Sequence, residues 1–435
     1  MSTARAEERL RALPVGWTVV ALGDLPLKSP IGYGITRPGP HVDHGVGMVR
    51  AADVQGGRVH PDHVRRVSHQ VDRDHPRSRV GAGDVLVVMV GRVGEAAVVT
   101  EEFEGWNASR TIGRISLVEP GPVDSDWLSA WLNSSYAREW CESRATGSTL
   151  QRTLNLAALR ELPVPVPPLA QARDFLRLMT VVEEKAQVDA DIVRTAPAVA
   201  DARFRSQTAG GWMPTRPFGE LARISGGSRV RPHTQGAQPG PAGPAGPAGP
   251  AGPVVAPADI LRSELAHLGA TGSEQAVTAD VPLCPPGSLL LAAREGGVRV
   301  VVNEVAVAPG RGVLVLEPES EGDQYWLLHA IRCHAVDLAS TAQGAGGREI
   351  SHRAFAAAAV PWAPADVRDR FAELAGRLHR RARAAAQEIV TLGALREALL
   401  DELLAGGPHR SLGSTPSYGA RVGGGGVQES LFGMR

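Results

Sequence analysis

A proline-rich segment followed by a long amphipathic stretch constrains this chain more than any other feature, because the pattern occurs twice. The first copy starts with the run Pro163–Pro168. This run cannot be helical, since proline lacks the N–H donor and forces the preceding residue into an extended conformation. After Pro168, apolar residues recur every three or four positions with charges between them, which predicts one long helix. We expect Pro197 to kink or end that helix.

The second copy lies near the C-terminus, where Val360–Pro364 precedes another amphipathic stretch. Pro364 suits a first helical turn, and Gly406-Gly407-Pro408 ends the pattern. Two such apolar stripes are best buried against each other, which favours an antiparallel, coiled-coil-like pair over two unrelated core helices. The predicted packing positions are Leu169, Leu176, Met179, Val182, Phe371, Leu374, Leu378, Ile389, Leu392 and Leu399.

Matching spacings indicate that the proline run and helix belong to a larger internal repeat. Gly23 and Gly219 are 196 residues apart, and Pro168 and Pro364 are also 196 residues apart. Shorter matches between these anchors pair Ala52–Val54 with Ala258–Ile260, Gly83–Val87 with Gly287–Leu291, and Gly147–Thr149 with Gly344–Gly347. The sequence therefore predicts two copies of one unit, each a globular domain followed by a long helix.

Each globular copy combines short strands with helices, which predicts a mixed α/β (α+β) fold. In the first copy, the apolar strand Val85–Val90 and the segment Ala96–Thr100 are predicted to form a hairpin through the Gly91–Gly94 turn. Asp124–Ser143 is predicted as one helix, and Asp323–Val336 as its counterpart. The chain is thus expected to contain two similar domains separated by two long antiparallel helices, with a pseudo-two-fold internal repeat.

The predicted boundaries are residues 1–167 for the first domain, 168–207 for the first helix, 208–363 for the second domain, 364–405 for the second helix and 406–435 for the tail. Within the second domain, the segment 239–253 repeats Pro-Ala-Gly with a collagen-like period. It is too short for a stable triple helix, so we expect a polyproline-II spacer or solvent loop. The Gly- and Ser-rich tail is predicted to be disordered.

Composition and cysteine spacing exclude several classes of function. The chain has 46 Lys and Arg against 46 Asp and Glu, so no overall basic field indicates nucleic acid. Cys141, Cys284 and Cys333 form no CxxC or Cys/His ligand pattern, which argues against a disulfide framework and a zinc site. No apolar run reaches the length of a membrane span and no signal core is present, so we expect a cytoplasmic protein.

Motifs for catalysis are absent from the sequence. There is no Walker loop and no GxGxxG after a strand, and Val166–Leu169 lacks both ends of the Asn/Asp-Pro-Pro-aromatic motif of adenine methyltransferases. Glu183-Glu184-Lys185 is spelled like part of a restriction-type nuclease site, but it lies inside the first predicted helix. His60-Pro61-Asp62-His63 is interpreted as surface or phosphate-contacting rather than as a metal site. We therefore predict a non-catalytic protein without a metal or cofactor of its own.

Arginines in a turn-rich segment indicate a binding function instead. Gly34–Arg79 carries eight Arg and six His against five Asp, a local basic surface on a neutral chain. Guanidinium groups suit both phosphate contacts and bidentate recognition of guanine, and Arg92 is expected to project from the Gly91–Gly94 turn. The candidate DNA-binding residues are Arg37, Arg50, Arg58, Arg65, Arg66, Arg77, Arg79, Arg92, Arg229, Arg231, Arg294, Arg299 and Arg348. For any one of them, a solvated surface charge is the alternative.

Four segments resemble the specificity subunit of type I restriction–modification systems: LPVGWTVVALGDL, ADVQGG, GDVLVVMVGRVG and TGSTLQRTLNLAALRELPVPVPPLAQ. The resemblance extends through about Leu404 and rests on the duplicated order of glycine loop, strand, proline run and helix. It implies two target recognition domains that each read half of a bipartite double-stranded DNA site, with the helices as a spacer. The chain departs from the family after the proline run, where Gln171 alone remains of a common Glu-Gln pair and Ala365-Asp366 has neither residue.

The resemblance also implies partners for this chain. Methyltransferase subunits would dock on the helices and carry S-adenosylmethionine and the adenine N6 chemistry. A restriction subunit would translocate and cut DNA in phage defence. Two other functions stay open, namely an assembly scaffold with degenerate recognition domains and a self-contained DNA-modifying enzyme. In the tail, Gln428, Leu431 and Phe432 belong to a QESLF segment that resembles the peptide by which bacterial proteins bind the replication sliding clamp.

Overall fold

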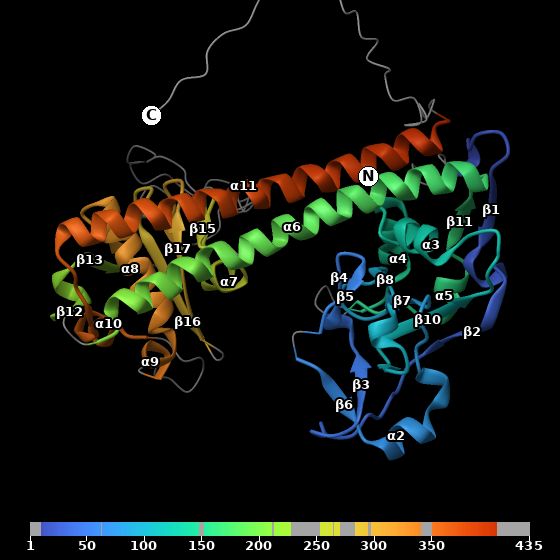
Figure 1. The fold of residues 1–435 in the computed structure, drawn as a ribbon, viewed down its shortest axis with the longest axis horizontal. Coiled ribbons are helices and arrows are strands. Elements are labelled where there is room, and N and C mark those ends of the chain that lie inside the picture. The colour runs from blue at the N-terminus through green and yellow to red at the C-terminus, as the bar shows by residue number, and fades with distance from the viewer. Residues whose placement is uncertain are drawn as a thin grey trace, which may run out of the picture. The chain divides into compact units, whose positions relative to one another are not determined.

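The computed structural model describes residues 10–61, 63–147, 152–210, 213–227, 253–263, 265–269, 283–294, 297–340 and 350–406. The chain divides into two compact units (Figure 1). The first unit comprises Met1–Val181 and Ala394–Arg435, and the second comprises Val182–Gly393. Each long helix therefore begins in one unit and ends in the other, whereas the predicted boundaries treat each helix as a separate segment.

A four-stranded antiparallel sheet in the order β2-β10-β7-β8 forms the centre of the first unit. Its strands are β2 (Leu27–Tyr33), β7 (Val85–Val88), β8 (Ala96–Val98) and β10 (Ile112–Leu117). All four side chains of β7 are buried, as its uninterrupted apolar run predicts for a strand covered on both faces. The predicted hairpin is present, because β7 pairs with β8.

Smaller elements surround this sheet. A three-stranded sheet, β6-β3-β9, pairs β3 antiparallel with β6 and parallel with β9. The remaining short elements are β3 (Val46–Val49), β4 (Val54–Gln55), β5 (Arg58–Val59), β6 (Arg65–Val67), β9 (Asn107–Ala108), η1 (Leu22–Asp24), η2 (Ala51–Asp53), η3 (Pro76–Ser78) and η4 (Glu101–Phe103). The short helices are α2 (His69–Asp74), α3 (Ser125–Leu132), α4 (Ser135–Arg144) and α5 (Leu156–Arg160).

The single helix predicted over Asp124–Ser143 is wrong, because α3 and α4 are separate. The Asn133 side chain bonds both backbone groups of Ala96 in β8, accepting from its N–H at 3.1 Å and donating to its carbonyl at 2.9 Å. Ser134 then caps α4 by accepting from the N–H of Ala137. Such polar side chains offer the backbone an alternative to helical hydrogen bonds, and here they end one helix and start the next.

The proline run forms a strand, as its inability to be helical requires. β11 (Pro163–Val166) pairs antiparallel with β1 (Thr18–Ala21). Trp127 of α3 donates its indole N–H to the carbonyl of Pro165 at 2.8 Å, and its ring packs edge-on against Phe175. The proline carbonyl thus satisfies a buried indole, since proline still accepts hydrogen bonds although it cannot donate.

The second unit repeats this topology. Its sheet has the order β13-β19-β16-β17-β15, in which the first four strands correspond to β2-β10-β7-β8, and β14 pairs parallel with β18 as β3 does with β9. The strands are β12 (Thr215–Pro217), β13 (Arg223–Gly226), β14 (Val254–Val255), β15 (His267–Leu268), β16 (Leu289–Arg294), β17 (Gly297–Asn303), β18 (Ala308–Pro309), β19 (Val313–Glu317) and β20 (Ala359–Pro361). The helices are η5 (Phe218–Glu220), α7 (Pro257–Arg262), α8 (Glu321–Cys333), α9 (Ala335–Ser340) and α10 (His352–Ala357).

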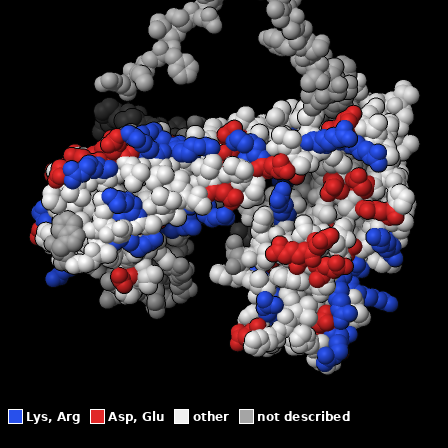
Figure 2. Space-filling view, in the orientation of Figure 1, with Lys and Arg blue, Asp and Glu red and all other residues white. Residues whose placement is uncertain are grey.

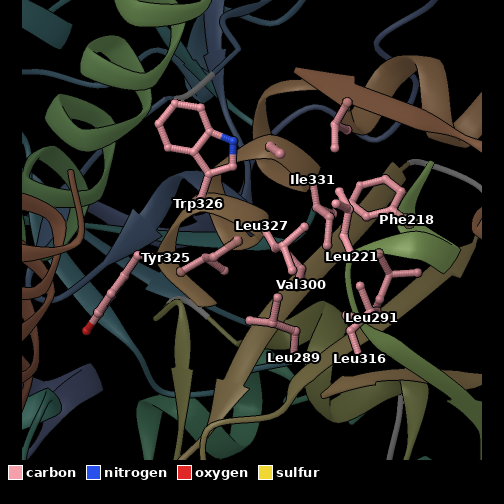
Figure 3. Close-up of a cluster of buried hydrophobic side chains, with 14 of the residues drawn as sticks. Phe218, Leu221, Leu289, Leu291, Val300, Leu316, Tyr325, Trp326, Leu327 and Ile331 are labelled. Carbon is pink, nitrogen blue, oxygen red and sulfur yellow. The ribbon is translucent and has the colours of Figure 1, made fainter. Parts of the chain in front are cut away.

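Figure 3 shows the core of the second unit, where side chains of β16 and α8 point toward one another. Leu289 and Leu291 come from the strand, Leu327 and Ile331 from the helix, and all four are almost fully buried. The alternation along β16 and the three-to-four-residue spacing along α8 produce one apolar face on each element.

The glycines that anchor the predicted repeat share one physical cause. A Cβ at Gly23 would lie 2.9 Å from the Cβ of Arg160 in α5, and a Cβ at Gly219 would lie 3.2 Å from the Cβ of Ala356 in α10. A short helix therefore crosses the same 3-10 turn in each unit, and glycine, which has no side chain, allows that close approach without a shift of the helix.

The aspartates of the predicted match between Ala52–Val54 and Ala258–Ile260 also have one role. Asp53 accepts from the backbone N–H of Arg50, and Asp259 accepts from that of Ala256, each at 2.8 Å. Each carboxylate closes the first turn of the short helix that follows β3 or β14. The predicted match of Gly147–Thr149 with Gly344–Gly347 lies outside the described residues except for Gly147.

The two long helices are α6 (Leu169–Thr208) and α11 (Ala365–Leu404), of 40 residues each. At about 1.5 Å per residue, each is about 60 Å long. In the second unit they pair antiparallel, because Lys185 contacts Glu388 at 2.7 Å while Phe204 packs against Phe371 further along. Pro197 lies inside α6, so of the two outcomes predicted for it, a kink or the end of the helix, the second is wrong. Its ring is buried, and tertiary packing outweighs the cost of the lost hydrogen bond.

A buried polar chain connects α6, α8 and α11 in the second unit. Asp201 lies 2.7 Å from His329 Nδ1, and His329 Nε2 lies 3.0 Å from His379 Nε2. The carboxylate can only accept, so His329 carries its proton on Nδ1 and accepts at Nε2 from His379. Arg332 also donates to both carboxylate oxygens of Asp201, from Nε and Nη2.

Burial and hydrogen bonding set the pKa values of the side chains in this polar chain. Burial alone would raise the pKa of Asp201, but the hydrogen bonds from His329 and Arg332 outweigh it and hold the pKa at about 2. Burial lowers the pKa of His379 to about 2 and that of the adjacent His267 to about 4. These imidazoles are therefore neutral at physiological pH.

Candidate nucleic-acid interface

Loops that follow or precede the central strands of the first unit are held together by backbone hydrogen bonds. Ile35 N–H donates to the carbonyl of Ala108 at 2.8 Å, and Arg110 N–H donates to the carbonyl of Ile35 at 2.9 Å. Ala51 N–H donates to the hydroxyl of Thr111 at 3.3 Å. Residues 34–37, 50–53 and 108–111, which are far apart in sequence, therefore form one surface, which we call the loop platform.

Three of the predicted DNA-binding arginines are bound to carboxylates of the chain itself. Arg79 makes two hydrogen bonds of 2.8 and 2.7 Å to Asp72, and the Arg79 guanidinium holds the pKa of that carboxyl below its usual range. Arg50 binds Asp53 in the same bidentate way, at 3.0 and 2.8 Å. Arg92 Nε lies 2.8 Å from Glu95. A guanidinium already matched to a carboxylate has fewer donors left for DNA.

Backbone carbonyls bind Arg92 as well and occupy two more of these arginines. Arg92 also donates to the carbonyl of Val54 at 2.8 Å, so the side chain expected to project from the Gly91–Gly94 turn is instead folded back onto the β4–β5 hairpin. Arg65 donates to the carbonyl of Gly39 at 2.6 Å, and Arg66 to that of Gly45 at 3.2 Å. These contacts close the loop between β2 and β3, which points to a structural role for Arg65 and Arg66.

The remaining predicted arginines of the first unit are free. Arg37, Arg58 and Arg77 are exposed, and no hydrogen bond or ion pair holds their side chains within the described part of the chain. Arg37 belongs to the loop platform and Arg58 to the hairpin beside Arg92. The structure therefore divides the predicted cluster into arginines that build the surface and arginines that are available to a phosphate.

Most of the predicted arginines of the second unit lie outside the described residues. Arg229, Arg231 and Arg348 lie outside the described residues, and the side chain of Arg294 does as well. Arg299 is exposed on β17 and donates to the carbonyl of Ser263. The segment 239–253 is outside the described residues except for Pro253, and so is the tail from residue 407, including Gln428, Leu431 and Phe432.

Charge is mixed on the surface. Figure 2 shows basic and acidic side chains interleaved on the visible face, in agreement with the 46 positive and 46 negative residues. DNA attraction by this chain would therefore come from local groups of arginine rather than from an overall field.

The residues considered for metal chemistry either pack between helices or lie on the surface. Lys185 pairs with Asp189 and Glu388, which places the Glu183-Glu184-Lys185 segment in helix packing. His60 and His63 are exposed, and Asp62 is outside the described residues. Among the residues that are described, no group of three His, Cys, Asp or Glu is arranged to hold a metal ion. Within the same part of the chain, none of the helices combines the length and apolar composition that crossing a membrane requires.

The predicted helix-packing residues are only partly buried. Met179 and Phe371 are buried, whereas Leu169 is 59% and Leu374 is 38% exposed, so the expectation for these two leucines is wrong. Phe175 and Ala375 take the inward positions instead. The residues at intermediate exposure are Leu176, Val182, Leu378, Ile389, Leu392 and Leu399. The buried stripe is thus rotated relative to the predicted one.

The protein is an internally duplicated chain, in which two topologically equivalent α/β units share a pair of 40-residue helices. No protein-family model matches the chain. The chain is 29% identical over 166 residues to the type I restriction enzyme EcoBI specificity subunit of Escherichia coli. This match covers 38% of the chain and 34% of the relative, about a third of its length.

Solved structures of the same kind are also similar to the chain. The type I restriction–modification S subunit from M. genitalium shares 14% identity over 90% of this chain and 96% of that one, with a TM-score of 0.48. The HsdS subunit from Thermoanaerobacter tengcongensis shares 18% identity over 91% and 98%, with a TM-score of 0.35. The resemblance to type I specificity subunits that the sequence predicts is confirmed by the curated relative.

Proposed function

We propose that this chain is the DNA-specificity subunit of a type I restriction–modification complex. The observation that carries the proposal is the duplication. Each unit has the same order of four strands, a short helix that crosses a glycine-containing 3-10 turn, and an aspartate that closes the first turn of the helix after β3 or β14. Two similar binding units in one chain suit a target made of two half-sites. The first unit supplies unpaired arginines in loops, which suit phosphate contact.

Partners and chemistry follow from the same proposal. N6-adenine methyltransferase subunits would bring S-adenosylmethionine and the methyl transfer, a restriction subunit would bring translocation and cleavage, and this chain would be non-catalytic. Exposed valines on the long helices support docking of a protein, since Val188 of α6 is 54% and Val390 of α11 is 65% exposed. Val390→Glu is expected to reduce recovery of the methyltransferase with the chain, while Glu402→Gln on the same helix leaves it unchanged.

Co-expression with an N6-adenine methyltransferase, followed by methylome sequencing, tests the proposal. A split methylated motif with a constant gap is the expected result. Methylation or cleavage by the purified chain alone would favour a self-contained enzyme. Stable binding of the methyltransferase without any sequence preference would favour a scaffold with degenerate recognition domains.

Two further proposals concern location and the tail. A cytoplasmic location is expected of a protein that acts on the chromosome. Deletion of residues 428–435 is expected to weaken any binding to the sliding clamp, because Leu431 and Phe432 would fill an apolar pocket. Unchanged clamp binding after that deletion would remove the idea without affecting the DNA-specificity proposal.

A further inference from the structure

One exposed arginine occurs at the same place in both units, although no sequence motif marks it. Arg110 is two residues beyond β9 and Arg311 is two residues beyond β18, the short strands that pair parallel with β3 and β14. Each arginine also comes just before the central strand of its sheet, β10 or β19.

The backbone around the two arginines is held in the same way. In the first unit, Ser109 N–H donates to the carbonyl of Val49 at 2.9 Å. In the second unit, Gly310 N–H donates to the carbonyl of Val255 at 2.8 Å. The residue before each arginine is thus bonded to the last residue of the parallel partner strand.

A close backbone approach supports each turn from the other side. A Cβ on Gly34 would lie 1.9 Å from the carbonyl oxygen of Ala108, and a Cβ on Gly227 would lie 2.0 Å from that of Gly310. Real Cβ atoms do not come so close, so glycine is required at both positions. The segment that follows β2 or β13 therefore packs directly against the turn that carries the arginine. This contact limits movement of the backbone at the arginine.

The two guanidinium groups are unoccupied. Arg110 and Arg311 are both exposed, and within the described residues neither side chain has a hydrogen-bond or ion-pair partner. This separates them from Arg50, Arg79 and Arg92, which are bound to carboxylates. An exposed charge on a firmly held turn retains five N–H donors for a ligand.

We propose that Arg110 and Arg311 are an equivalent pair of DNA-backbone contacts, one for each half of the target. This inference rests on the proposed function. The two half-sites of a split target differ in bases but share the phosphate backbone, so a residue repeated in both units suits the phosphate. Such a contact orients each unit on its half-site, while other loop residues read the bases.

Salt-dependent binding of the full-length chain to a random-sequence duplex tests the pair, because each phosphate contact contributes about one unit to the slope of log affinity against log salt. Arg110→Gln and Arg311→Gln are each expected to lower that slope by about one, and the double variant by about two. Arg110→Lys and Arg311→Lys are expected to retain most of it, since lysine still binds phosphate as a point charge. Arg11→Gln and Arg353→Gln, also exposed, serve as controls in the first and second unit.

The outcomes separate this inference from the function on which it rests. Slopes equal to that of the wild-type chain in both glutamine variants, or a loss in only one of the two units, would overturn the pair while leaving DNA binding established. Failure of the lysine variants to retain the slope, with thermal unfolding unchanged, would also overturn a phosphate contact. If the wild-type chain did not bind duplex DNA, the proposed function would fail and the pair with it.

Discussion

Trp127 in the first unit and Trp326 in the second occupy the same place, each donating its indole N–H at 2.8 Å to the carbonyl of a proline, Pro165 or Pro361. What surrounds them differs. In the first unit the helix pair buries Phe175, Met179, Leu400 and Leu403, all apolar. In the second, the corresponding space also holds the chain of Asp201, His329 and His379.

This difference shows which parts of the repeat are interchangeable. The turns, the glycines and the indole-to-proline bond depend on the backbone, so both units retain them. The side chains beneath the helices need only fill space and satisfy one another. The first unit therefore uses apolar residues with bonds such as that from Tyr136 to Asp401, and the second adds a buried polar chain. A buried polar chain is stable only when every member is paired, which makes the second unit the more vulnerable of the two.

Truncating the two tryptophans should produce the largest effect and test whether they are equivalent. Trp127→Ala and Trp326→Ala are each expected to lower the unfolding free energy of their own unit by about 3–5 kcal/mol, through lost burial and a residual cavity. Hydrogen exchange followed by mass spectrometry separates the two units. Val336→Ala, at a position 83% exposed, is the control. Loss of protection in both units after either change would contradict their separate packing.

Acidification should affect the second unit before the first. The pKa of His267 is lowered by burial to about 4, so between pH 6.5 and 4 the unfolded state binds more protons than the folded state. Stability of the second unit therefore falls as pH drops through this range, by about 3 kcal/mol at pH 4 from this group alone. Asp201, with its pKa held at about 2, adds a further loss below pH 3.8. Calorimetry across pH 7 to 2 measures both losses.

His267→Phe provides a matched test of the acid sensitivity. His267 Nε2 has no hydrogen-bond partner although the residue is only 7% exposed, so phenylalanine removes an unsatisfied polar atom while keeping an aromatic side chain at this position. We expect the variant to equal or exceed the wild-type chain in stability at pH 7 and to lose less on acidification. An unchanged slope of stability against pH would assign the acid sensitivity to other groups.

The anchor glycines allow a finer comparison. Gly23→Ala would place a Cβ 2.9 Å from Arg160, whereas Gly219→Ala would place one 3.2 Å from Ala356. Gly23→Ala is expected to cost about 1–2 kcal/mol and Gly219→Ala less than about 1 kcal/mol, because the first contact forces a larger shift. Urea unfolding followed by tryptophan fluorescence ranks the two variants, with Gly393→Ala, which has open space around its Cβ, as the control. The reverse ranking would show that α10 shifts less readily than α5 to make room for the added Cβ atom.

Much of this fold could be predicted because its signals are local. The proline-rich run 163–168 excludes a helix, and the periodicity after Pro168 favours one. Gly23 matches Gly219 because a neighbouring short helix approaches each of them closely. The break at Asn133 was not predictable, because it depends on bonds to Ala96 in a distant strand. The helix through Pro197 likewise depends on tertiary packing.

The candidate site was less predictable for the same reason. Composition indicates that arginines gather in residues 34–79, but it cannot tell which of them meet a carboxylate. Asp72 is seven residues before Arg79 and binds it only because α2 and the following 3-10 turn bring them together. Arg110 stands alone in the sequence and becomes notable only when the parallel pairing of β3 with β9 shows its likeness to Arg311.

The smallest expected effect distinguishes arginines that bind DNA from arginines that build the surface. Arg37→Gln, Arg58→Gln and Arg77→Gln are each expected to lower the salt slope of duplex binding by up to about one, with thermal stability unchanged, because their guanidinium groups are free. Arg79→Gln should do the opposite. It leaves the buried Asp72 with Asn107 as its remaining side-chain partner, so the first unit becomes less stable while the salt slope is kept. Equal slopes in all four variants, measured by fluorescence anisotropy, would mean that pairing within the chain does not decide which arginines reach the phosphates.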